Sequence, residues 1–128
     1  VAVLKQMVKD LDYPICIRAL ATVREKDGLA LSSRNKYLSD DERQQARSLY
    51  QSLLLAKTLA ENGERNAQHI IAQMKKVIQK NSSAKIDYIS CVDTITLLPL
   101  KRLEGNVLVA LAVFFGKTRL IDNILIKA

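Results

Sequence analysis

The 128 residues carry 20 Lys and Arg against 13 Asp and Glu, for a net charge of +7, and 48% of them are hydrophobic. This composition is typical of one soluble globular domain and excludes an intrinsically disordered chain. The longest apolar run, residues 107–115, is about half as long as a transmembrane helix, which excludes a membrane-spanning protein. The first residues, VAVLKQ, do not resemble a signal peptide, so we expect a cytoplasmic protein.

The positive charge favours polyanionic partners, which include nucleic acid, a membrane surface and phosphate-bearing substrates. The basic residues are scattered, however, with Lys75–Lys76 and Lys101–Arg102 as the only adjacent pairs. Aromatic residues make up 5% of the chain and Trp is absent, so there is no aromatic and basic platform for nucleic acid. We therefore expect most of this charge to be solvated, with neither nucleic acid nor a membrane as a partner.

The first segment, residues 1–11, has the apolar spacing of an amphipathic helix, and Pro14 ends it soon afterwards. Residues 15–21 (ICIRALA) predict a short strand. Helix followed by strand is the closing half of a βαβ unit, so we expect residues 1–21 to be a remnant of a Rossmann-like sheet. Because no capping residue precedes the helix, we expect the chain to be a piece of a longer protein. Its apolar residues Leu4, Met7 and Val8 must then pack on the rest of the chain or in a non-native dimer.

Residues 22–38 are predicted to be a loop, and two helices follow it. Ser39 and Glu42 form a capping box, which starts a helix that should run to about Glu61 before Asn62-Gly63 ends it. A second amphipathic helix is predicted over residues 67–80, with Asn66 as its N-cap. The expected buried positions of the two helices are Ala46, Leu49, Tyr50, Leu53, Leu54, Ala60, Ile70, Ile71, Met74, Val77 and Ile78.

Three strands are predicted in the last third of the chain. Residues 85–92 alternate as in a half-buried strand, residues 107–115 are continuously apolar as in a central strand, and residues 118–126 form the last one. The sequence therefore predicts an α+β domain over residues 39–128, with two helices packed on a small antiparallel sheet. Cys16 and Cys91 both lie in strand-like segments, and we expect them to be buried, reduced thiols.

Several kinds of site are absent from the sequence. The only histidine, His69, lies on the polar side of the second helix and is expected to be solvated. There is no Ser-His-Asp set, CxxC pair, GxGxxG or GxxxxGK[ST] motif. A self-contained hydrolytic, redox or P-loop site is thereby excluded, and no metal site is expected.

The stretch DGLALSSRN, residues 27–35, concentrates hydrogen-bond donors between the first strand and the first capped helix. Gly28 can adopt positive φ, and Ser32, Ser33 and Arg34 offer hydroxyls and a guanidinium fork suited to phosphate oxygens. The nearby helix N-terminus would attract the same anion. On residue chemistry alone, a polyphosphate site and an ordinary polar loop fit this stretch equally well.

The segment VREKDGLALSSRNKYLS resembles the signature of the pantothenate synthetases, the pantoate–β-alanine ligases. The flanking VAVLKQMVKDLDYPICI and FFGKTRLIDN are similar to the same family, so the resemblance covers the whole chain but only the family's C-terminal part. It implies a ligase that forms pantoyl-adenylate from pantoate and ATP with Mg²⁺, and then transfers the pantoyl group to β-alanine. It also implies a homodimer for the complete enzyme and a likeness to class I aminoacyl-tRNA synthetases.

The resemblance also implies the site residues. Leu31, Ser32, Ser33 and Arg34 would line the ATP site, Val23 would meet the nucleotide through its backbone, and the two serines with Arg34 would act catalytically on the triphosphate. Residues 1–21 would be the remnant of a Rossmann-like nucleotide-binding domain, residues 22–38 a hinge that carries this loop, and residues 39–128 a lid domain. The family's histidine motif, its glycine-lysine-aspartate segment and its pantoate-binding glutamines are not among these residues, so we expect the isolated chain to be inactive.

Two other interpretations stay open on the sequence alone. The chain could be a small basic nucleic-acid-binding domain, in which case oligonucleotide binding would weaken steeply with salt. It could also be a stand-alone interaction domain. The ligase interpretation differs from both because it depends on Arg34.

Overall fold

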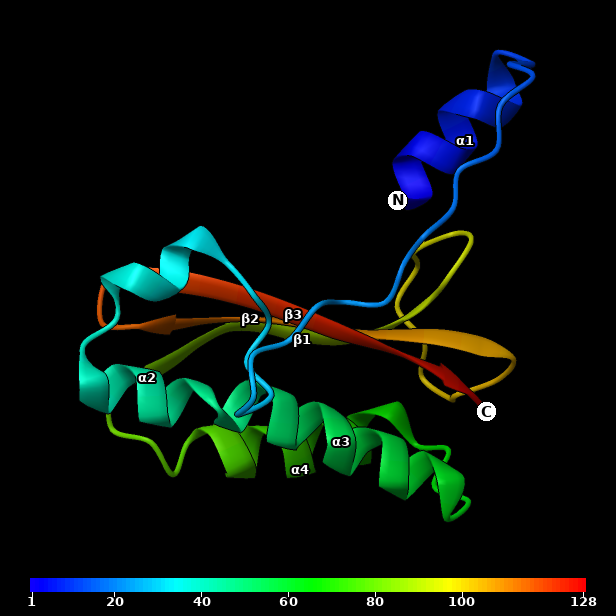
Figure 1. Cartoon of the computed structure of the whole chain (residues 1–128). Coiled ribbons are helices and arrows are strands. Elements are labelled where there is room, and N and C mark those ends of the chain that lie inside the picture. The colour runs from blue at the N-terminus through cyan, green and yellow to red at the C-terminus, as the bar shows by residue number, and fades with distance from the viewer.

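The computed structural model describes all 128 residues and arranges most of them as a helical layer against one antiparallel sheet (Figure 1). The predicted α+β class, with helices on a small antiparallel sheet, is confirmed. In chain order the elements are α1 (Ala2–Asp10), the 3-10 helix η1 (Ser33–Tyr37), α2 (Asp40–Ala46), α3 (Ser48–Glu61), α4 (Ala67–Ile78), β1 (Ala84–Asp93), β2 (Asn106–Phe115) and β3 (Thr118–Lys127).

The three strands form a sheet in the order β1-β2-β3, and both pairings are antiparallel. β2 is the central strand, as its continuous apolar run predicts. Its alternate residues, Val107, Val109, Leu111, Val113 and Phe115, have no exposed surface because they face the helices. A tight turn at Gly116-Lys117 joins β2 to β3, so the beginning of β3 lies at the same end of the sheet as the end of β2.

The helical layer starts at the predicted capping box. The amide of Glu42 donates to the Ser39 hydroxyl at 3.2 Å, and the Glu42 carboxylate accepts from the Ser39 amide at 2.8 Å. Asn66 caps α4 by accepting from the His69 amide at 3.1 Å, again as predicted. None of the helices is both long and apolar enough to cross a membrane.

The predicted continuous helix from residue 39 to 61 is wrong, because it divides into α2 and α3 at Arg47. The Arg47 amide donates to the Gln44 carbonyl, three residues earlier, and the Ser48 hydroxyl donates to the Gln45 carbonyl at 2.7 Å. A serine that bonds to a nearby carbonyl competes with the regular helical ladder. The two helices still bury one apolar side together with α4 and the sheet, although Leu54 is exposed.

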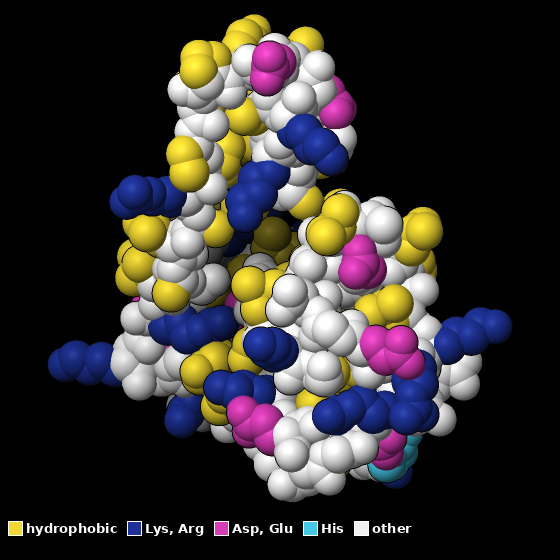
Figure 2. Space-filling view, turned by 90° about the vertical axis from the view of Figure 1, so that its right-hand side faces the viewer, with side chains coloured by type: hydrophobic (Ala, Val, Ile, Leu, Met, Phe, Trp, Pro, Cys, Tyr) yellow, Lys and Arg dark blue, Asp and Glu magenta, His cyan; other side chains and the backbone are white.

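The N-terminal arm, residues 1–21, departs most from the prediction. Helix α1 forms, but no residue in it is buried, and Leu4 and Met7 are 49% and 44% exposed. Figures 1 and 2 show it standing away from the sheet, with hydrophobic side chains on the projecting lobe and basic side chains spread over the face below. The expected packing of this helix on its own chain is therefore wrong, and its burial in a dimer stays a prediction.

The predicted strand over residues 15–21 is also wrong, since these residues form no ladder with any part of the chain. A strand needs a neighbour to satisfy its backbone N–H and C=O groups, and the arm has none within reach. The same difference exposes Cys16, whereas Cys91 on β1 is buried as expected. Both cysteines are free.

We expect the two thiols to react at very different rates. Burial raises the pKa of the Cys91 thiol to about 11, so little reactive thiolate forms near neutral pH, and the sulfur is enclosed by the core. Cys16 should be modified rapidly by a thiol reagent, and Cys91 only when the protein unfolds. Mass spectrometry of the labelled chain, with Cys16→Ser as the control, measures this. Equal labelling of both cysteines in the folded protein would contradict it.

Candidate functional site

The loop that precedes the helices is itself folded into a small hairpin. Arg24 and Ala30 form an antiparallel bridge, and the Leu31 amide bonds to the Val23 carbonyl at 2.9 Å. Gly28 closes the hairpin with φ of +90°, as the sequence suggests. The close neighbour of its backbone is the Tyr50 ring, because a Cβ at this position would lie 2.5 Å from Tyr50 Cδ1. Glycine is therefore required here to seat the hairpin on α3.

A buried ion pair fastens this hairpin to the sheet. Arg24 bonds to Asp122 on β3 in two places, Nη1 to Oδ2 at 2.6 Å and Nη2 to Oδ1 at 3.0 Å. The Asp122 side chain is 2% exposed, and the Arg24 guanidinium also lies 4.0 Å from the centre of the Tyr50 ring. This paired fork joins residues that are 98 positions apart. No local pattern in the sequence could have identified the two partners.

A second set of contacts fastens the hairpin to α2 and η1. Arg43 Nη2 lies 2.5 Å from Glu25 Oε2 and 3.2 Å from Asp27 Oδ2. The side-chain amide of Asn35, on η1, donates through Nδ2 to Glu25 Oε1 at 2.7 Å and to the Ala30 carbonyl at 3.0 Å. The loop that carries the Ser-Ser-Arg stretch is thus held from three sides by charged and polar contacts.

Acid is expected to loosen this second set of contacts. The Arg43 guanidinium and the Asn35 amide hold the pKa of the Glu25 carboxyl below its ordinary value of 4.5. Between the folded and the ordinary pKa, the unfolded chain binds more protons. The stabilisation by Glu25 is therefore complete above pH 4.5 and is lost as the pH falls through the lower, folded pKa.

Comparison of Glu25→Gln with the unsubstituted protein tests this effect. The variant should lose less stability between neutral pH and acid, as measured by urea unfolding at several pH values. Glu61→Gln is the matched control, since that side chain is 59% exposed and has only a 3.8 Å contact with Lys57. Parallel pH curves for the Glu25→Gln and unsubstituted proteins would contradict the assignment.

The predicted site residues lie at the two ends of the hairpin and in η1. Ser32 caps η1, since its hydroxyl oxygen accepts from the Arg34 amide at 3.2 Å, which leaves the hydroxyl hydrogen free to donate. The side chains of Val23, Leu31, Ser32, Ser33 and Arg34 are all on exposed residues. Arg34 forms no ion pair, so its guanidinium is available to a ligand.

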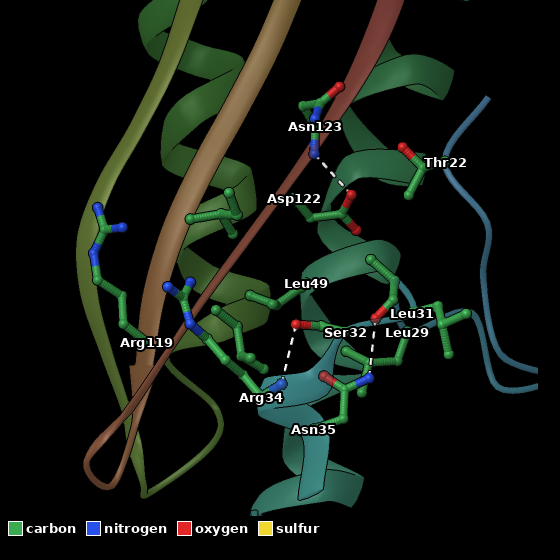
Figure 3. A pocket seen from close by; sticks show the side chains of 13 residues that line it. Thr22, Leu29, Leu31, Ser32, Arg34, Asn35, Leu49, Arg119, Asp122 and Asn123 are labelled. Carbon is green, nitrogen blue, oxygen red and sulfur yellow. Dashed lines mark hydrogen bonds between the residues drawn. The ribbon is translucent and has the colours of Figure 1, made fainter. Parts of the chain in front are cut away.

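Two hollows meet at Arg34. The first has a volume of about 300 Å³ and lies between the loop and β3 (Figure 3). It brings together Leu31, Ser32 and Arg34, but not Ser33 or Val23. The second has a volume of about 440 Å³ and lies between η1 and the β2–β3 turn. Arg119 of β3, which the sequence analysis does not identify, lines both hollows together with Arg34.

The expected help from a helix N-terminus is not available at this site. The helix that follows Ser39 carries Asp40, Asp41 and Glu42 in its first turn. These carboxylates and the capping box already occupy the positive end of the helix dipole and would repel an added anion. Any phosphate must therefore be held by side chains of the loop and the sheet.

Neither a metal cluster nor the histidine contributes to the site. No group of three or more His, Cys, Asp and Glu side chains is arranged to hold a metal ion. Asp122, the one carboxylate that lines the first hollow, is bonded to Arg24. His69 is exposed on α4, where its ring nitrogens contact Glu64 and Gln73, in agreement with the predicted solvated role.

Comparison with known proteins places the chain in a family. Residues 1–125 match the family model described as Pantoate-beta-alanine ligase. The pantothenate synthetase of Caldicellulosiruptor saccharolyticus is 54% identical over 126 residues, which are 98% of this chain and 45% of that protein. The pantothenate synthetase of Thermosipho melanesiensis is 52% identical over 124 residues, 97% of this chain and 44% of that protein.

Solved structures agree with the sequence comparison. The crystal structure of the pantothenate synthetase from Thermus thermophilus has a TM-score of 0.89 at 36% identity, and the match covers 96% of this chain and 44% of that one. The pantoate-beta-alanine ligase from Francisella tularensis, complexed with beta-gamma ATP and beta-alanine, has a TM-score of 0.56 at 29% identity, over 96% and 38% of the two chains.

The chain thus spans about half the length of the curated relatives that it matches. The match runs through the hairpin, the Ser-Ser-Arg loop and all but the last two residues of the sheet, and it favours the ligase interpretation over a nucleic-acid-binding or interaction domain. The chain belongs to the pantoate–β-alanine ligase family.

Proposed function

We propose that this chain supplies the triphosphate-binding part of an ATP-dependent ligase that condenses pantoate with β-alanine through a pantoyl-adenylate. The observation that carries the proposal is the position of Arg34, a guanidinium without an ion pair where two hollows meet beside Ser32. The family match and the ATP and β-alanine in the Francisella ligase support this choice of substrates. Pantothenate biosynthesis is then the pathway that the chain serves.

Each predicted site residue has a role in this reaction. The pantoate carboxylate attacks the α-phosphorus of ATP, and the bond to the bridging oxygen of the β-phosphate breaks, which releases pyrophosphate. The β-alanine amine then displaces AMP from the adenylate. Arg34 and the hydroxyls of Ser32 and Ser33 stabilise the charge that develops on the phosphates, while Leu31 and the Val23 backbone lie beside the nucleotide. Their contribution is positioning and electrostatics, since none of them transfers a proton.

In this proposal Mg²⁺ is bound by the phosphates of ATP and not by side chains of this chain. The residues around the two hollows offer no free carboxylate, because Asp122 is held by Arg24 and Asp87 by Arg119. Mg²⁺ prefers oxygen ligands and is commonly bound through substrate phosphates. The side chains of this chain do not fit as its ligands, and the roles of Ser32, Ser33 and Arg34 do not depend on it.

The proposal also assigns the parts of the chain. Residues 1–21 belong to a nucleotide-binding domain, residues 22–38 form the hinge and phosphate loop, and residues 39–128 are the lid. The solvent-exposed apolar stripe of α1 supports a separate role for the arm, and the contacts of Arg24 and Arg43 support a loop carried by the lid. The complete ligase is proposed to be a cytoplasmic homodimer.

A chimaera tests the proposed function. The 128 residues would replace the matching 45% of the Caldicellulosiruptor saccharolyticus synthetase, and pantothenate formation would be measured with ATP, pantoate and β-alanine. The chimaera should be active, whereas the 128-residue chain alone should show no turnover. A folded chimaera without activity would contradict the proposed function, and turnover by the isolated chain would contradict its dependence on the rest of the ligase.

A further inference from the structure

We propose that the β2–β3 turn completes the triphosphate site, with Lys117 and Arg119 joining Arg34 to hold the two terminal phosphates, which leave as pyrophosphate. This inference rests on the proposed function and adds residues that the Ser-Ser-Arg stretch does not contain. The ligand class is an inorganic or nucleotide-borne diphosphate, whose chemistry suits a pocket of cations and hydroxyl groups.

The second hollow supplies the geometry. Five residues line it, Arg34 and Tyr37 from η1, and Lys117, Thr118 and Arg119 from the turn and the start of β3. Three of the five are cations and none is an acid. Figure 1 shows η1 and the β2–β3 turn at the same end of the sheet, and η1 packs against β3. Segments about 80 residues apart therefore present their positive charges to one volume of about 440 Å³.

The charge in this hollow is largely uncompensated. Neither Arg34 nor Lys117 has a carboxylate within ion-pair distance. Arg119 donates to one oxygen of Asp87 through Nε at 3.0 Å and through Nη2 at 2.7 Å. The Nη1 side of its guanidinium is left for another acceptor. Like charges that share one hollow repel each other, and a bound polyanion would convert that repulsion into attraction.

The turn that carries Lys117 lies against the start of α2. Gly116 has φ of +54°, and the Glu42 carboxylate occupies the space that a Cβ would need. That carboxylate also accepts from the Ser39 amide, so the capping box of α2 supports the turn from below. Lys117 is therefore carried by a turn that packs against the capping box at the start of α2.

The different linings of the two hollows indicate that the terminal phosphates bind in the second one. The first is lined mainly by residues of the loop and β3 and includes Leu29, Leu31 and, from α3, Leu49, whereas the second is lined mainly by cations. Arg34 and Arg119 line both. A triphosphate that passes Ser32 would therefore reach the cationic hollow with the end farthest from the nucleoside. This end departs as pyrophosphate when the adenylate forms.

Titration calorimetry of the 128-residue chain with inorganic pyrophosphate, and separately with ATP, tests the inference. Lys117→Gln should weaken pyrophosphate binding about tenfold, as expected for the loss of one charge-assisted contact. Asp87→Asn, which releases Arg119, should strengthen it. Lys75→Gln is the matched control, since it removes the same charge from an exposed position on α4 and should change the affinity less than about twofold. Circular dichroism would show that each variant is folded.

The outcomes separate this inference from the proposed function. If pyrophosphate does not bind saturably, or if the two lysine variants weaken binding equally, the specific site is wrong. If Arg34→Ala weakens ATP binding and Lys117→Gln alters neither ligand, the proposed function stands and the role of the turn is wrong. If Lys117→Gln selectively weakens pyrophosphate binding while the chimaera is inactive, the diphosphate site stands without the ligase.

Discussion

Asp122→Asn is expected to lower the free energy of unfolding by about 3 kcal/mol, because it leaves a buried guanidinium without its counter-charge. The Asp122 side chain is 2% exposed and that of Arg24 18%, so water can replace little of the lost interaction. The substitution keeps the shape of the side chain, so the effect reports the charge and its two bonds to Arg24. Equilibrium unfolding in urea measures it.

The same substitution should also release the hairpin locally. When Asp122 is replaced, hydrogen exchange at the hairpin amides of Leu29 and Leu31 is expected to accelerate more than exchange at the core amides of β2. Asp87→Asn is the control, because it breaks an arginine pair on the same sheet whose side chains are 40% and 41% exposed. Such an exposed pair contributes only about 0–1 kcal/mol. Equal losses of stability in the two variants would show that Arg24 and Asp122 have no special structural role.

Arg34→Ala is expected to reduce kcat/KM for ATP in the chimaera by about 100- to 1,000-fold, the range seen when one donor to a developing negative charge is removed. Arg34 has no ion pair, and its main-chain capping contact with Ser32 does not involve the guanidinium. The fold should therefore remain intact. Steady-state kinetics with ATP varied, together with thermal unfolding, measure both expectations.

Two further variants make this experiment specific. Arg34→Lys keeps the charge but loses the planar fork, and should recover only part of the activity if two phosphate oxygens are held together. Arg102→Ala removes a side chain that is 71% exposed and forms an ion pair only with Glu104, so it should leave kcat/KM unchanged. Full activity of Arg34→Ala would exclude a catalytic role for Arg34.

The features predicted correctly from the sequence are those whose causes are local. The capping box of Ser39 and Glu42 and the cap at Asn66 each involve residues only three apart, so the chain carries both partners in one short stretch. The apolar run of β2 predicted a buried central strand for a similar reason, since an apolar run indicates burial without identifying the neighbours that provide it.

The errors arose where a strand has no neighbouring strand and where a side chain competes with the backbone for a carbonyl. Residues 15–21 have the composition of a strand, but a strand forms only where another strand completes its hydrogen bonds. The break at Arg47 depends on a competition between hydroxyl and backbone that apolar periodicity does not register.

The candidate site also has one part that is contiguous in the sequence and another that the tertiary structure adds. By itself the sequence determined the loop with Leu31, Ser32 and Arg34, because these residues are contiguous and their side-chain chemistry is visible in the order of the chain. Only the tertiary structure decided that Asp122 anchors this loop and that Lys117 and Arg119 face Arg34. These residues lie about 80 to 100 positions away, and only the antiparallel return of β3 beside η1 brings their charges into the same space.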